Sequence, residues 1–219
     1  QPKILLLDEP LGALDKKLRE RTQFELVNLQ ERLGITFIIV THDQEEAMTM
    51  SSRIALLHDG RVEQVDNPRR MYEFPATRYA ANFIGSVNLF NGHVVEHEND
   101  MVVIHSEEAG GDLRVHHSQP LSIGMAVTVA VRPEKVAVTS EYENAPNNIH
   151  GIIQEIAYLG DVSIYHVDLP SGKRHLGEST LEGAIHERLE ECLLQINVEW
   201  FPEHMSELYG GSRMACDNN

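Results

Sequence analysis

Cysteine and long apolar runs are both scarce in this 219-residue sequence, and each shortage excludes a class of protein. The two cysteines, Cys192 and Cys216, are too few for a disulfide framework, and they fit a reducing compartment. No apolar stretch approaches the roughly 18 residues that a membrane-spanning helix needs. We therefore expect any contact with a membrane to be made through a partner protein.

Positive charge is also scarce. The chain carries 18 Lys and Arg against 34 Asp and Glu, which gives a formal net charge of -16. Residues 1–90 hold 11 basic and 13 acidic residues, a net -2, whereas residues 91–219 hold 7 and 21, a net -14. Such a surface repels phosphate, so nucleic acid and anionic lipid are poor partners for it. The hydrophobic content of 42% is ordinary for a folded globular protein.

Near the start of the chain, the apolar run Ile4–Leu7 is followed at once by two carboxylates, Asp8 and Glu9. An unbroken apolar run is typical of a buried parallel strand, and ligands of open α/β sheets bind beyond the carboxyl ends of the strands. Asp8 could hold hydrated Mg2+ there, and Glu9 could polarise a water molecule for attack on phosphorus. Taken alone, the run is equally compatible with an apolar strand that ends in an acidic turn.

A second apolar run, Ile35–Val40, is rich in β-branched residues and ends in polar residues that include His42. A lone histidine at the end of a strand is more often a structural residue. Together, however, the two runs resemble the ATP-binding subunit of ABC transporters, with three motifs in the family's order and at its spacing. These motifs are the Walker B strand with its glutamate at residues 4–9, the D-loop Gly12-Ala13-Leu14-Asp15 and the switch histidine His42.

The resemblance implies the C-terminal part of a P-loop NTPase domain, an α/β fold, with ATP and Mg2+ as cofactors. It implies that Asp8 binds Mg2+ through a water molecule, that Glu9 is the catalytic residue that acts on the attacking water, and that His42 contacts the γ-phosphate. In this family two ATP molecules are held between the two copies of a homodimer. The residues that would reach across that interface are the D-loop residues Gly12, Leu14 and Asp15. The implied partners are membrane permease subunits and, indirectly, a periplasmic binding protein, at the cytoplasmic face of the inner membrane.

Three motifs of the family are missing from the sequence. No Gly-x-x-x-x-Gly-Lys-Ser/Thr loop is present to wrap the β-phosphate, and neither the glutamine loop nor a Leu-Ser-Gly-Gly-Gln signature occurs. All three precede Walker B in this family. We therefore expect the chain to be the C-terminal part of a longer subunit, and we expect it neither to bind ATP tightly nor to hydrolyse it alone.

Periodicity predicts the elements between and after the two strands. A helix is expected over residues 15–33 and is ended by Gly34; its apolar positions at helical spacing are Leu18, Leu26, Leu29 and Leu33. Strand, helix and strand imply a parallel pair with a right-handed crossover. Asp43 with Glu46 three residues later forms an acidic variant of the capping box, which predicts a short helix directly after His42.

The Asp59-Gly60 turn predicts a hairpin over residues 53–65, and Pro68 suits the first turn of a helix that runs to about Phe74. A further helix is expected after Pro75, to about Ile84. This stretch resembles the closing hairpin of the same ATPase domain, which we place at residues 1–86. Asp66 stands where the family usually has glycine, so the conformation of that turn is left open.

From residue 87 the sequence changes to short strands separated by Gly, Pro, Asn and Asp, which is typical of a small barrel. The expected strands are residues 92–96, 101–105, 113–116, 126–131, 149–158, 162–169 and 194–200. A faint repeat, residues 127–134 against 195–203, suggests paired lobes. The pattern resembles the OB-like accessory domain called TOBE, which we place at residues 87–209, and we expect residues 210–219 to form a disordered tail.

The resemblance is strongest to ATPases of spermidine and putrescine importers, although sulfate, iron and sugar importers use similar subunits. Within the TOBE region Arg132, Glu134 and Asp161 match the family and are candidate regulatory residues. A polyamine could bind carboxylates such as Asp161, Glu155 or Asp168, but an acidic surface that serves only solubility is the simpler interpretation. The alternative for the whole chain is a stand-alone regulatory or small-ligand-binding module.

Seven histidines invite a metal site but show no Cys-x-x-Cys or His-x-x-x-His pair at zinc-ligand spacing, so we expect them to be scattered surface residues. They are His105, His116, His117, His150, His166, His175 and His186.

Overall fold

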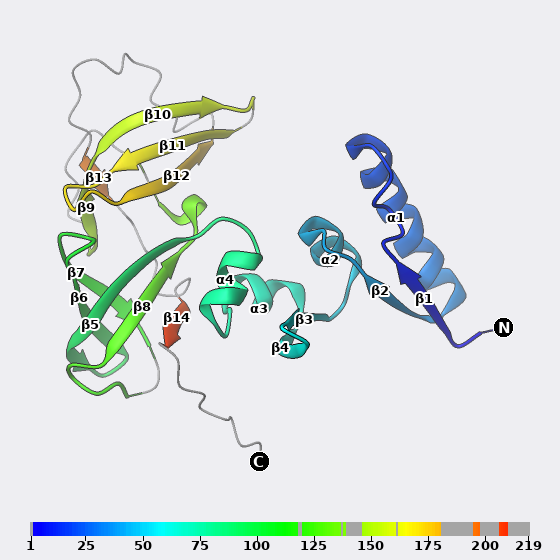
Figure 1. Cartoon of the computed structure of the whole chain (residues 1–219), viewed down its shortest axis with the longest axis horizontal. Helices are drawn as coiled ribbons and strands as arrows, with labels where there is room; N and C mark the ends of the chain where they lie inside the picture. Colours follow the sequence, from blue (N-terminus) through cyan, green and yellow to red (C-terminus); the bar gives the residue numbers. More distant parts are fainter. Residues whose placement is uncertain are drawn as a thin grey trace. The chain divides into compact units, whose positions relative to one another are not determined.

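The computed structural model describes residues 2–117, 120–136, 138, 146–160, 162–180, 195–197 and 206–209. The chain divides into two compact units between Gly85 and Ser86 (Figure 1). The first unit is mixed α/β and the second is rich in strands. The expected sequence of a mixed first part and a β-rich second part is therefore confirmed at this level.

The first unit contains the elements that the sequence pattern predicts. They are β1 (Ile4–Asp8), α1 (Lys16–Leu33), β2 (Thr36–Val40), α2 (Gln44–Met50), β3 (Ile54–His58), β4 (Arg61–Asp66), α3 (Pro68–Glu73) and α4 (Arg78–Phe83). Each helix begins after a side chain that accepts a hydrogen bond from its first turn, which satisfies an otherwise unpaired backbone N–H. These caps are Asp15, Asp43, Asn67 and Thr77. Gly34 ends α1 in the left-handed conformation, at φ 63°.

Strands β1 and β2 pair in parallel, as predicted, with Ile4 opposite Thr36 and Asp8 opposite Val40. The expectation that both strands are buried is wrong for one face. Its apolar side chains are 48 to 71% exposed, and they are Ile4, Leu6, Ile38 and Val40. Alternate residues on the other face are half-buried. The reason is geometric: successive side chains of a strand point to opposite faces, and a two-stranded sheet needs a cover on each.

Helix α1 also differs from its expected apolar face. Leu26 and Leu29 are half-buried, whereas Leu18 and Leu33 are 46 and 52% exposed. The best-buried side chain of the helix is Gln23, at 4% exposure. Periodicity therefore located the helix correctly but did not identify which of its turns are covered.

The hairpin and the two short helices share a small core within the first unit. Strands β3 and β4 pair antiparallel, and Asp66 closes that pairing opposite Ile54. The buried side chains of this core are Ile54, Leu56, Met71, Ala80 and Ile84. The ring of His58 stacks on Tyr79 with 3.7 Å between centroids. The closing segment of the unit thus has packing of its own.

The second unit consists of β5 (Asn88–Glu98), β6 (Met101–Ser106), β7 (Gly111–His116), β8 (Ala126–Val131), the 3-10 turn η1 (Pro133–Lys135), β9 (Asn148–His150), β10 (Ile152–Tyr158), β11 (Val162–Asp168), β12 (Arg174–Thr180), β13 (Gln195–Asn197) and β14 (Ser206–Tyr209). They form three sheets, in the orders β14-β8-β5-β6-β7, β10-β11-β12 and β13-β9. Among the described strands no sheet closes on itself, so the expected closed barrel is not observed. Strands β12 and β14 were not predicted. The second repeat copy and residues 210–219 fall mostly or wholly outside the described residues.

The core of the second unit joins residues from several sheets and includes one buried histidine. Its fully buried side chains include Ile104, Val129 and Tyr165. His175 is 7% exposed and stacks on Phe90 at a centroid distance of 4.1 Å and an angle of 4°. Neither of its ring nitrogens has a hydrogen-bond partner in the part of the chain that is described. The expectation of a surface histidine is therefore wrong here, because one face of the imidazole packs as an aromatic ring.

Burial lowers the pKa of His175 from 6.5 to about 4, and the nearby Lys173 ammonium adds to the effect. The unfolded chain then binds one more proton than the folded chain between these two pH values. Stability from the neutral ring is present above about pH 6.5 and is lost as the pH falls toward 4. At about 1.4 kcal/mol for each pH unit, the loss amounts to about 3 kcal/mol at pH 4.

Replacement of His175 by Phe should keep the stacked ring and remove this loss. We expect the free energy of urea unfolding to fall less between pH 7 and pH 4 in His175→Phe than in the parent chain. The exposed His150 provides the matched control, since His150→Phe should leave the pH dependence unchanged. Equal acid sensitivity of the parent chain and His175→Phe would show that the ring is not responsible.

Candidate functional site

The candidate site lies where β1 and β2 end side by side. Glu9 follows the last residue of β1, and its N–H donates to Val40 O at 2.9 Å, which extends the ladder by one bond. Its φ of 46° lies in the left-handed region, where residues other than glycine are uncommon. The backbone therefore turns sharply at Glu9, and this residue stands at the rim of the sheet instead of continuing the strand.

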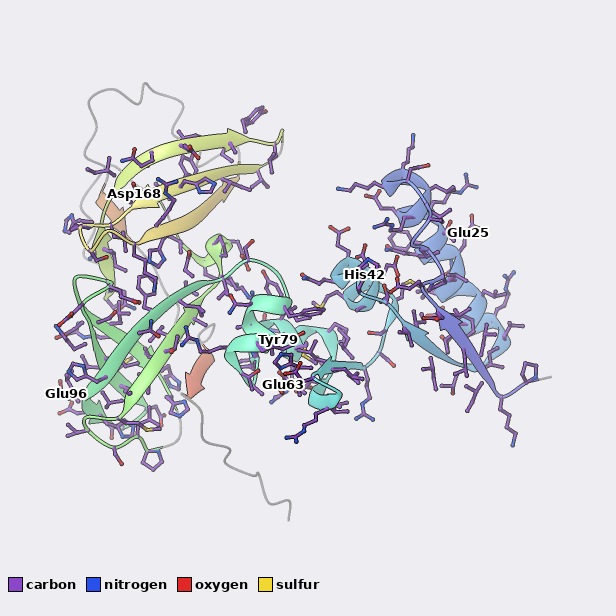
Figure 2. The ribbon with its side chains drawn as sticks, in the orientation of Figure 1. Glu25, His42, Glu63, Tyr79, Glu96 and Asp168 are labelled. Carbon is purple, nitrogen blue, oxygen red and sulfur yellow. The ribbon has the colours of Figure 1, made fainter. Side chains whose placement is uncertain are left out.

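The carboxylate of Glu9 contacts His42 through one oxygen. His42 N donates to Glu9 Oε1 at 3.2 Å, and His42 Nδ1 lies 2.7 Å from the same oxygen. The hydrogen bond that the His42 ring makes to the Glu9 carboxylate, together with the negative charge of Glu9, raises the pKa of His42 above 6.5. The His42 side chain is 83% exposed and that of Glu9 40% exposed, so both are accessible to a ligand. Figure 2 shows His42 near the start of α2.

Asp8 is exposed next to this pair, at the end of β1. A carboxylate suits Mg2+, which takes hard oxygen ligands and keeps several of its waters. Among the described residues no three acidic, histidine or cysteine side chains are grouped closely enough to hold a metal ion. One carboxylate fits an ion that arrives with oxygen ligands of its own, such as those of a nucleotide. The metal role of Asp8 stays a prediction.

The D-loop forms a compact turn after Glu9. Gly12 N donates to Glu9 O at 3.3 Å and Leu14 N to Leu11 O at 3.0 Å, while Leu11 is buried at 2% exposure. Asp15 accepts from Leu18 N at 3.0 Å and so caps α1. Within this chain the Asp15 carboxylate thus has a structural role. Its expected contact with a second copy, and those of Gly12 and Leu14, stay predictions.

The segment that carries His42 is held by a local network that the sequence only partly indicated. Asp43 accepts from Glu46 N at 3.1 Å, which is half of a capping box. The other half runs through a hydroxyl: Asp43 N donates to Thr41 Oγ1 at 3.0 Å, and Thr41 Oγ1 donates to Glu46 Oε2 at 2.9 Å. Arg19 of α1 contacts Asp43 as well. An arginine four residues after the Asp15 cap was the available signal, and sequence reasoning missed it.

The structure describes two of the three candidate regulatory residues of the second unit, Arg132 and Glu134. Arg132 is 6% exposed and its Nη1 donates to Ser86 O at 3.0 Å, which fits a structural role. Glu134 is exposed on η1, and Asp161 lies outside the described residues. Their regulatory role stays a prediction.

Two further carboxylates were considered for a polyamine. Arg174 binds Asp168 with two hydrogen bonds, Nε to Oδ1 at 2.7 Å and Nη2 to Oδ2 at 3.3 Å, and this lowers the pKa of Asp168. Glu155 is exposed. Because the chain itself already neutralises Asp168, the structure favours an ion pair at this position over a free carboxylate for a cation.

The remaining histidines lie mainly on the strands of the second unit. His105 Nδ1 is 2.7 Å from Asp112 Oδ1, and His116 Nε2 is 3.9 Å from Asp100 Oδ2. His117 is half-buried, and burial together with the nearby His97 and His116 lowers its pKa. His150 is exposed, His166 is half-buried, and His186 lies outside the described residues.

Known proteins are similar in sequence to both units of the chain. Residues 129–191 match the family model described as the TOBE domain. The chain is 49% identical over 174 residues to the putrescine transport ATP-binding protein PotG of Escherichia coli K12, a match that covers 79% of this chain and 46% of PotG. It is also 49% identical over 178 residues to the spermidine/putrescine import ATP-binding protein PotA of Rubrobacter xylanophilus, a match that covers 80% of this chain and 46% of that protein. The corresponding PotA of Pseudomonas aeruginosa UCBPP-PA14 is 45% identical, and the match covers 80% of this chain and 48% of that protein.

A solved structure, the cytoplasmic molybdate-binding protein ModG with molybdate bound, aligns with 56% of this chain and 95% of its own, at 17% identity and a TM-score of 0.45. No helix among the described residues is long and apolar enough to span a membrane. The chain spans about half the length of the curated relatives it matches. It is a member of the family of PotA- and PotG-type ATP-binding proteins of ABC transporters and corresponds to their C-terminal part, with a TOBE domain.

Proposed function

We propose that this chain is the C-terminal part of the ATP-hydrolysing, energy-coupling subunit of a polyamine ABC importer. The observation that carries the proposal is the contact between Glu9 and His42 at the shared end of two parallel strands. Identities of 45 to 49% to PotG and PotA support the polyamine assignment. ATP and Mg2+ are the proposed cofactors. Two copies of the subunit, permease subunits at the cytoplasmic membrane face and, indirectly, a periplasmic binding protein are the proposed partners.

The geometry suits the polarisation of a water molecule. In the proposed role, Glu9 accepts the proton of the attacking water, and His42 holds the Glu9 carboxylate through Oε1. Since both contacts from His42 go to Oε1, Oε2 is the oxygen that can face the water. His42 Nδ1 donates to the Glu9 carboxylate, so Nε2 can donate to a phosphate oxygen only when the ring is doubly protonated, which the raised pKa of His42 favours. Magnesium, when bound with the nucleotide at Asp8, would stabilise the negative charge of the phosphates.

The uncovered apolar face of β1 and β2 supports the proposal that these strands belong to a larger sheet. Parallel sheets are normally covered on both faces, and a polar solvent-facing side would alternate along the strand. Here the exposed face carries Ile4, Leu6, Ile38 and Val40 instead. The phosphate-binding loop that this sequence lacks would, in the proposed subunit, come from the part of the relatives that the chain does not match. We therefore propose that these 219 residues alone are inactive.

A polyamine-binding or regulatory role for the second unit is the alternative. The ion pair between Asp168 and Arg174 does not favour it. Titration of the chain with spermidine by calorimetry distinguishes the two, because the transporter role requires no heat from this unit beyond a salt-screened background.

Glu9→Gln tests the proposed base in a full-length subunit that carries this segment. Loss of a general base should lower ATP turnover by about 10^2- to 10^4-fold, while nucleotide binding stays intact because the amide keeps the size of the side chain. Glu25→Gln is the matched control: Glu25 is an exposed glutamate of α1, 66% accessible, and should be neutral. The measurement is steady-state phosphate release with parallel nucleotide titration. Undiminished turnover of Glu9→Gln would show that the assignment of Glu9 is wrong. If the 219 residues alone hydrolyse ATP, and Glu9→Gln abolishes that hydrolysis, the proposal that they are inactive is wrong.

His42→Ala should act in the same direction as Glu9→Gln on turnover. In the chain itself, the pKa of His42 can be followed by nuclear magnetic resonance of the imidazole. We expect a value above 6.5 in the parent chain and a lower one in Glu9→Gln, since the carboxylate is the main cause of the increase. Because the folded pKa is raised, the contact is complete below about pH 6.5 and weakens as the pH rises through the folded value. An identical titration curve in Glu9→Gln would exclude the contact in solution.

A further inference from the structure

Arg19 lies at the start of α1, and its guanidinium contacts two segments that are far apart in the sequence. Nη2 donates to Leu14 O at 3.2 Å, inside the D-loop. Nη1 forms an ion pair with Asp43 Oδ2 at 2.5 Å, in the residue next to His42. One rigid, planar group therefore connects the turn at residues 12–15 with the segment that carries the proposed γ-phosphate contact.

The third guanidinium nitrogen of Arg19, Nε, lies near the buried carboxylate of Glu46. Glu46 has a side chain that is 1% exposed, and its Oε1 lies 3.9 Å from Arg19 Nε. That Nε is itself buried and has no hydrogen-bond partner in the described chain. At 3.9 Å the contact is electrostatic and longer than a hydrogen bond. Because a buried carboxylate needs a compensating charge, Glu46 ties the position of α2 to that of Arg19.

The two ends of the connection are not interchangeable. Asp43 caps α2 through Oδ1 and holds Arg19 through Oδ2, so a shift of the guanidinium acts on the first residue of the His42 turn. At the other end a single backbone carbonyl accepts from Arg19. A lysine can neutralise Asp43 or Glu46, but its single ammonium cannot reproduce a fork that spans both segments.

We propose that Arg19 is a positioning residue that couples the D-loop to the orientation of His42, so that the state of residues 12–15 is transmitted to the water-activating pair. The inference rests on the proposed function for its consequence in catalysis, whereas the coupling itself is a property of this chain. It gives the D-loop an effect within its own copy, in addition to the contact with a second copy that the family resemblance implies. The sequence pattern assigned no role to Arg19.

The coupling can be measured in the 219-residue chain without nucleotide. Asp43→Asn removes the charge but keeps a good helix cap. We expect this change to shift the backbone amide resonances of Gly12 and Leu14 in the parent chain, and to leave them unmoved in an Arg19→Lys background. Arg21→Lys is the matched control: Arg21 lies two residues further along α1, is 78% exposed and pairs only with Glu25 among the described residues. Shifts of equal size in the Arg19→Lys background, or no shift in the parent chain, would overturn the coupling.

The consequence for catalysis is measured in the full-length subunit. Arg19→Lys should lower kcat by about ten- to a hundredfold, as expected for a misplaced catalytic group, with KM for ATP changed less than threefold. Arg21→Lys should leave both constants unchanged. If Arg19→Lys has a normal kcat and only Arg19→Gln fails to fold, the role of Arg19 is limited to neutralising nearby carboxylates. That result would overturn the proposal. If instead Glu9→Gln retains turnover while the amide coupling is present, the proposed function fails and the coupling stands.

Discussion

The parallel pairing of β1 and β2 is the constraint on which the candidate site depends. It places Asp8 opposite Val40, so the two strands end together and the residues that follow them meet. The hydrogen bond from Glu9 N to Val40 O extends that ladder to the turn. The contact between Glu9 and His42 is then a consequence of register: a slip of one residue would turn one of the two side chains to the opposite face.

Around this pair the chain uses charge more than apolar packing. Glu46 is one of the few fully buried side chains of the first unit; Thr41 donates a hydrogen bond to it, and the Arg19 guanidinium lies 3.9 Å away as its counter-charge. Buried charges are costly to separate from their partners, so such a network resists small displacements better than exposed ion pairs do. The apolar face of β1 and β2, in contrast, has no cover in the described chain. The site is therefore well defined locally on a sheet that lacks part of its packing.

The second unit obtains its stability in a different way. Its core is formed by side chains of several sheets, and the ring of His175 is buried there as an aromatic partner of Phe90. Some acidic side chains of this unit form ion pairs: Glu108 pairs with Lys173, and Asp168 with Arg174. Lys173 and Asn91 lower the pKa of Glu108 to about 2 against the effect of its partial burial. The count of 21 acidic residues in this part of the sequence thus overstates how many carboxylates are free for a ligand.

The sequence by itself determined the elements of the first unit and predicted the residues of its candidate site. Apolar runs, caps such as Asp15 and Asp43, and the Asp59-Gly60 turn are local signals, since each depends on neighbours within a few residues. Strand β12 was missed although a Ser171-Gly172 turn precedes it, and strand β14 was missed as well. Only the tertiary structure decided that one face of β1 and β2 is uncovered, that His175 is buried and that Arg19 connects two distant segments. These features depend on contacts between residues far apart in the chain, and periodicity and spacing carry no information about such contacts.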